Sequence, residues 1–322
     1  MRLILSLFIS VLFTAYSFGQ EIRIEKKNIS DTVFNDQRSL IIPSDSLDAM
    51  KVMLKLFPGK LYDLSSKDYK NIFISWECKK CKPAAYADVN WVEGDQQFPY
   101  KDGVATRLIN VTDYKDSKGN QFKILAFNHS AYDEDGVQTG RFTGGLLGLA
   151  KFAKIGGSWQ MRSFQPAIAA FGSFASSPKP APLVIGEDQY AFTVLHENGG
   201  ADRPFEGILF LIAGTNGKYR PILANGQYEL TETDEGETRW QSTIKVDNDS
   251  KKQYFRDIII TTKGHYHKNE NEEDELYKGP YEIASFIKNK KSFDFVIEKR
   301  YVFDGKEYVM KPKPAVSVTN AK

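Results

Sequence analysis

The chain has little cysteine, little histidine and almost no net charge over its 322 residues. Its 43 lysines and arginines nearly balance 41 aspartates and glutamates, so no charge excess favours nucleic acid or an anionic membrane surface as the main partner. Glycine and proline, at 24 and 13 residues, are too sparse for a collagen-like or low-complexity chain. Because 41% of the residues are hydrophobic and 13% are aromatic, the chain can bury a sizeable core.

Only one long apolar run is present, and it lies at the N-terminus. Arg2 precedes an apolar stretch over residues 3–13. The small residues Ser17 and Gly19 lie at the positions that signal peptidase recognises for cleavage before Gln20. The stretch is shorter than the ~20 residues that a membrane-spanning helix needs. We therefore expect residues 1–19 to be a signal peptide and the mature chain to be exported, periplasmic or extracellular, with no membrane span.

Residues 20–70 are expected to form a polar lead-in followed by one amphipathic helix. Leu47, Met50, Leu54 and Phe57 recur at helical spacing, which predicts a helix over residues 46–57. Ser44 is the expected N-cap, and the Pro-Gly pair that follows the helix is expected to stop it.

From Asn71 onward the hydrophobic period changes from 3.6 to 2. In residues 240–246, for example, apolar and polar side chains alternate as in a half-buried strand. Gly-containing turn signals separate many such segments. The pattern predicts an all-β, mainly antiparallel fold over residues 71–310, propeller-like or sandwich-like, in one unit or two subdomains. Residues 311–322 are expected to be a disordered tail.

The last hairpin is expected to turn at Asp304-Gly305. With those two residues as the turn, Tyr301 would lie opposite Tyr308 across the ladder, and such an aromatic pair contributes up to ~1 kcal/mol.

Several motifs occur in a fixed order, namely Cys-x-x-Cys at 78–81, Gly157-Ser158-Trp159 to Phe164, Gly172-Ser173-Phe174, Ile185-Gly186 with Tyr190-Ala191-Phe192, and residues 301–308. This order resembles a group of uncharacterised secreted or periplasmic bacterial proteins. The resemblance spans roughly residues 71–310 and implies export and a β-rich fold, with no activity attached to it. This chain departs from the group in having Lys79-Lys80 between its cysteines, where the group often has a histidine.

Cys78 and Cys81 are the only cysteines, and in an exported chain they favour a local disulfide. A Trp and a Cys-x-x-Cys after a strand are also typical of thioredoxin-like oxidoreductases. Against that function, Pro83 and the following residues predict no helix whose dipole would lower the thiol pKa. A second cysteine pair for zinc is absent.

His265 and His267 are the only closely spaced histidines. Residues i and i+2 of a strand share a face, so both imidazoles could bind one transition metal. The alternative is a solvated strand end beside the acidic run at residues 269–275.

No Gly-x-Ser-x-Gly elbow and no phosphate-binding loop occurs, and nothing in the sequence calls for a cofactor. The sequence favours a non-catalytic binding or envelope protein with an unknown partner, a carbohydrate or a protein. The alternatives are a secreted hydrolase of carbohydrate or peptide that uses paired carboxylates, and a thiol-disulfide protein.

Overall fold

The computed structural model describes residues 24–35, 37–91, 96–132, 141–197, 205–233, 236–249, 251–268 and 279–320. Strands make up 55% of these residues and helices 7%, which confirms the expected β-rich, mainly antiparallel fold. The expected signal peptide and the acidic run at 269–275 lie outside the described residues. Within the described part of the chain, no helix has the length and apolar character needed to cross a bilayer.

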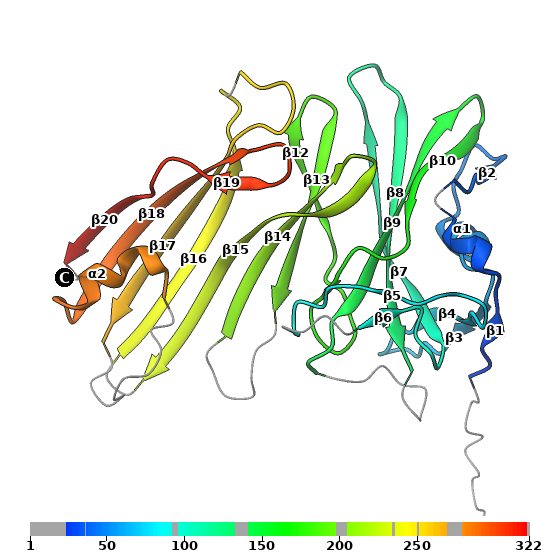
Figure 1. Ribbon diagram of the computed structural model, residues 1–322, viewed down its shortest axis with the longest axis horizontal. Helices are drawn as coiled ribbons and strands as arrows, with labels where there is room; N and C mark the ends of the chain where they lie inside the picture. Colours follow the sequence, from blue (N-terminus) through cyan, green and yellow to red (C-terminus); the bar gives the residue numbers. More distant parts are fainter. Residues whose placement is uncertain are drawn as a thin grey trace, which may run out of the picture.

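The first large sheet curls into a half-barrel (Figure 1). Its neighbours pair antiparallel, except that β1 runs parallel to β4. The strand order is β1 (Lys27–Asn28), β4 (Ile72–Glu77), β7 (Val104–Lys115), β8 (Gln121–Ala131), β9 (Gly145–Ile155), β10 (Ser158–Gln165) and β2 (Ile41–Ile42), with β3 (Lys60–Asp63) on β4 and β11 (Ala170–Phe171) on β9.

Residues 27–42, which we call the N-terminal strap, join the two ends of this strand order, because β1 pairs at one end and β2 at the other. Between them the strap forms the short 3-10 helix η1 (Asp31–Phe34). Its side chains Ile29 and Val33 are buried in the same core cluster as Trp76 and Trp159. The lead-in therefore contributes strands to the first sheet.

Helix α1 (Ala49–Leu56) packs on the inner face of the first sheet with its apolar side, since Val52, Met53 and Leu56 are buried in that core. The helix begins later than expected. The Asp48 carboxylate accepts the Lys51 N–H at 3.1 Å and caps the helix, so Ser44 lies outside it.

The second large sheet is a meander in which consecutive strands are neighbours. The expected alternation at 240–246 is present, because Ser242 and Val246 are buried while Gln241 and Lys245 are exposed. The strand order is β12 (Ala181–Gly186), β13 (Gln189–Glu197), β14 (Phe205–Thr215), β15 (Lys218–Thr233), β16 (Gly236–Val246), β17 (Ile258–His267), β18 (Ser292–Phe303) and β19 (Tyr308–Met310), with β20 (Ala315–Asn320) also on β18.

The two sheets meet around β8 and β9 of the first and β13 and β14 of the second. Ile124 and Ala126 pack with Phe192 and Ile212, whereas Phe127 on the opposite face of β8 packs in the core with α1. This explains why the middle of β8 is buried on both faces. Neither a propeller nor a sandwich is confirmed, since nine strands form each sheet and the sheets lie largely side by side (Figure 1).

The C-terminal segment differs from its expected structure in two ways. The hairpin pairs Phe303 with Tyr308, because the Asp304 carboxylate accepts the N–H groups of Lys306 and Glu307 at 2.8 Å and lengthens the turn. The tail expected to be disordered instead forms β20, whose residues pair with Phe293–Glu298 of β18. The prolines at 312 and 314 lie in the connection before β20 and do not end the ordered chain.

Two small elements complete the described fold. A two-stranded sheet of β5 (Ala84–Ala85) and β6 (Gln97–Phe98) lies beside the first large sheet. The short helices η2 (Tyr281–Ile283) and α2 (Ala284–Ile287) pack against β18 through Ile283 and Phe286, and Lys299 pairs with Glu282 at 2.7 Å.

Candidate functional site

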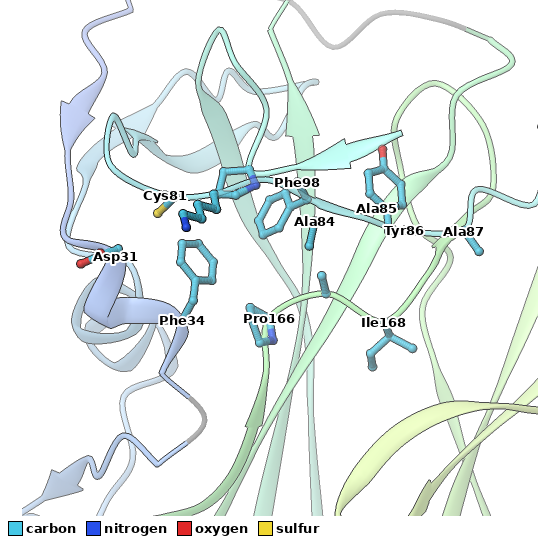
Figure 2. Close-up of a pocket in the computed structure, with 13 residues that line it drawn as sticks. Asp31, Phe34, Cys81, Ala84, Ala85, Tyr86, Ala87, Phe98, Pro166 and Ile168 are labelled. Carbon is cyan, nitrogen blue, oxygen red and sulfur yellow. The ribbon is translucent and has the colours of Figure 1, made fainter. Parts of the chain in front are cut away.

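A cavity of about 480 Å³ lies between η1, the β5–β6 sheet and the chain that joins β10 to β11 (Figure 2). Its lining is mainly apolar and aromatic, and Asp31 and Lys82 are the charged residues among those described in it. The wall made by β5 carries the small side chains of Ala84 and Ala85, which leave the cavity beside it open. The lining comprises Asp31, Phe34, Cys81, Lys82, Ala84, Ala85, Tyr86, Ala87, Phe98, Pro99, Pro166, Ala167 and Ile168.

Phe98 is the best-anchored side chain of the lining. It is 5% exposed, and its ring lies 5.9 Å from Trp76 and 5.8 Å from Phe34 between centroids, edge to face in both pairs. Its ring also packs against His129, with 4.7 Å between centroids. Aromatic pairs at such distances stabilise beyond their buried area, so this wall of the cavity is rigid.

A buried hydrogen-bond chain lies behind Phe98. The Trp76 indole N–H donates to Thr106 Oγ1 at 2.7 Å, and Thr106 Oγ1 lies 2.7 Å from His129 Nδ1. The indole nitrogen can only donate, so the Thr106 hydroxyl oxygen accepts that proton and makes a second hydrogen bond with His129 Nδ1. Complete burial lowers the pKa of His129 to about 3, so the imidazole is neutral at physiological pH.

Two tyrosines adjoin the cavity. The Tyr86 hydroxyl donates to that of Tyr100 at 3.3 Å, and burial raises the pKa of Tyr86 above its ordinary value. Burial also raises the pKa of Tyr100, and raises it further. Both phenols therefore stay protonated at neutral pH, and neither is poised to act as a base.

Cys78 and Cys81 form a disulfide, as the sequence predicted, with their Cα atoms 5.4 Å apart. The bond closes the loop between β4 and β5, and Lys79 N–H donates to Asn28 Oδ1 of the strap at 3.0 Å. Lys79, Lys80 and Lys82 are exposed on this loop. Cys81 lines the cavity, and a strand follows it rather than a helix, so the dipole that activates thioredoxin-like thiols is missing here.

We expect replacement of both cysteines by serine to cost about 2 kcal/mol or less in the free energy of unfolding. The disulfide closes a very small ring, so it removes little entropy from the unfolded chain. Urea unfolding of the mutant and the parent measures the difference, and thiol titration of the native, non-reduced protein should find no free thiol. Two reactive thiols per chain would contradict the bond.

The histidine pair gains no set of metal ligands. His265 Nδ1 lies 2.8 Å from Asp294 Oδ1, and its Nε2 lies 3.1 Å from Ser292 Oγ, so both ring nitrogens already have partners. Among the described residues no three histidine, cysteine or acidic side chains converge as a metal site would require. The metal site at His265 and His267 stays a sequence prediction.

Large aromatic side chains are exposed on three neighbouring segments away from the cavity. Trp91 is 50% exposed, and Phe142 and Phe174 are each 58% exposed. Hydrogen bonds tie these segments together, since Asn90 donates to Gly172 O at 2.9 Å and Ala175 N–H donates to Thr143 O at 2.8 Å. Exposed aromatic rings suit stacking on sugars, so this is the surface on which binding of a carbohydrate partner would be tested.

The cavity was beyond the reach of sequence reasoning. Its lining comes from four segments that range from Asp31 to Ile168, and only Cys81 among these residues was singled out beforehand. The one available signal was the placement of the cysteine pair directly after a buried strand. No family model, no curated protein and no solved structure matches this chain.

Proposed function

We propose that the protein is an exported, non-catalytic binding protein that takes an apolar group into the cavity beside the disulfide. The observation that carries the proposal is the lining, which combines aromatic and aliphatic side chains with one carboxylate and one ammonium group. Ligand sites are typically concave, mainly apolar and 300–1,000 Å³ in volume, with few polar groups. A cavity of about 480 Å³ fits that description.

The chemistry of the lining favours binding over catalysis. Glycoside cleavage uses two carboxyl groups about 5–10 Å apart, and among the residues that the structure describes Asp31 is the one carboxylate in the lining. Both cysteines are bonded to each other in the disulfide, so no thiol is free to act as a nucleophile. Export rests on the leader-like N-terminus and on the cysteine pair, since disulfides persist in oxidising compartments.

Binding of N-phenyl-1-naphthylamine, an uncharged dye that fluoresces in apolar surroundings, tests the proposal. The parent protein should bind the dye, and Ala84→Trp should weaken binding about tenfold or more, equivalent to 1.4 kcal/mol, because the indole fills the cavity. Ala181→Trp is the matched control, since Ala181 is also an exposed alanine in a strand but lies away from the cavity. Equal dye binding by both variants would rule out this cavity as the site.

A further inference from the structure

The cavity lies where two backbone segments separate. At one end they are joined, because Ala170 N–H donates to Ala87 O at 2.8 Å and Val89 N–H donates to Ala170 O at 3.1 Å. Toward Ala84 and Pro166 they diverge, and the cavity occupies the space between them (Figure 2). The site thus resembles a strand pair that is closed at one end and open at the other.

The open side of β5 presents unpaired backbone groups to this space. In the ladder with β6, Ala84 lies opposite Phe98 and Tyr86 N–H donates to Gln96 O at 3.0 Å. Hydrogen-bonding direction alternates along a strand, so the N–H and C=O of Ala85 point away from β6. Ala87 points the same way, as its bond to Ala170 confirms. Within the described chain, neither group of Ala85 nor the N–H of Ala87 has a hydrogen-bond partner.

We propose that the ligand is an extended peptide segment that adds as a strand along residues 84–87 and places an apolar side chain in the cavity. The proposal rests on the proposed function and names its ligand class. Strand addition of this kind draws its affinity from main-chain hydrogen bonds and its specificity from a side-chain pocket beside the edge. Both components are present at this one place, the first in Ala85 and Ala87 and the second in the lining around Phe98 and Ile168.

Other features of the edge favour a peptide over a purely apolar molecule. An apolar molecule would cover the N–H and C=O of Ala85 without replacing their bonds to water, and each such loss weakens binding. A peptide strand would replace them. Edges that proteins protect carry lysine, proline or inward-pointing charge, whereas residues 84–87 are three exposed alanines and one buried tyrosine.

A set of uncharged, blocked heptapeptides tests the proposal on the full mature chain. Each alternates threonine and valine around one central residue, which is valine, leucine, isoleucine, methionine, phenylalanine, tyrosine or tryptophan across the set. At least one should displace N-phenyl-1-naphthylamine from the parent protein and should bind Ala84→Trp at least tenfold more weakly. The best peptide is then made with N-methyl groups on its odd residues or on its even residues.

The two methylated peptides separate the outcomes. Only one of a strand's two edges faces β5, so one methylation pattern should weaken binding at least tenfold and the other should change it less than threefold. If the dye binds but no peptide displaces it, or if both methylated peptides bind equally well, the peptide proposal is wrong while the apolar site stands. If neither dye nor peptide binds, the proposed function fails as well.

Discussion

Replacement of Phe57 by alanine is expected to lower the free energy of unfolding by about 3–5 kcal/mol, the range for a large aromatic side chain removed from a packed core. The Phe57 side chain is 0% exposed, and its ring stacks on Trp76 at 5.7 Å and meets Phe127 and His129 at 5.2 and 4.9 Å between centroids. It therefore fastens the end of α1 to the inner face of the half-barrel. A loss of this size approaches the whole stability of a small protein.

Urea unfolding followed by tryptophan fluorescence measures this loss. Leu61→Ala is the control, since Leu61 is 44% exposed and its truncation should change stability by less than about 0.5 kcal/mol. Phe57→Leu should fall between the two because it keeps part of the volume. A loss below 1 kcal/mol for Phe57→Ala would mean that α1 is not packed as described.

Acidification is expected to destabilise the protein through His129. Its pKa is about 3 in the folded protein because of burial, and about 6.5 in the unfolded chain. Between those two pH values the unfolded chain binds more protons, so the free energy of unfolding falls as the pH falls. From pH 7 to pH 4.5 this one group should remove about 2.5 kcal/mol, and the loss should begin near pH 6.5.

The contribution of His129 is isolated by comparison with His129→Leu, which cannot titrate. The two proteins share all other titrating groups, so the difference between their stabilities should change by about 2.5 kcal/mol over that pH range. Proton NMR of the parent protein gives a second readout that does not depend on the variant folding. The ring signals of His129 should not titrate between pH 8 and pH 4.5, and a midpoint near pH 6.5 would refute the buried, neutral imidazole.

The strands were predictable where one face of a strand is buried and the other is solvated. The alternation around Ser242 and Val246 appears in the structure because β16 has this environment. In β8, by contrast, the middle residues are buried on both faces of the strand. The sequence there does not alternate, so it cannot show which face of the strand contacts which core. Whether the strands form a propeller or a sandwich depends on how the sheets contact each other. That contact is made by packing between residues such as Ile124 and Phe192, and no local sequence pattern reveals it.

Other parts of the fold depended on interactions that a single segment does not reveal. The hairpin register shifted by two residues because the Asp304 carboxylate accepts hydrogen bonds from the N–H groups of Lys306 and Glu307, although the same side chains still share a face. β20 was missed because the prolines at 312 and 314 disfavour a strand, whereas Val316 and Val318 just beyond them pack on the core beside Phe293. The disulfide was predictable because no other cysteine competes for either partner.

The strap also has a consequence for the order in which the molecule assembles. β1 needs β4 as a neighbour, and β2 needs β10, whose Trp159 is more than a hundred residues later in the chain than its partner Ile42. During synthesis the strap therefore emerges first and can dock only after most of the first sheet exists. Contacts between such distant segments slow folding, because a long loop must close before they form. Until then the β10 edge and the end of β4 that β3 leaves uncovered stay open to other chains, which makes this the interval in which a chaperone has most to protect.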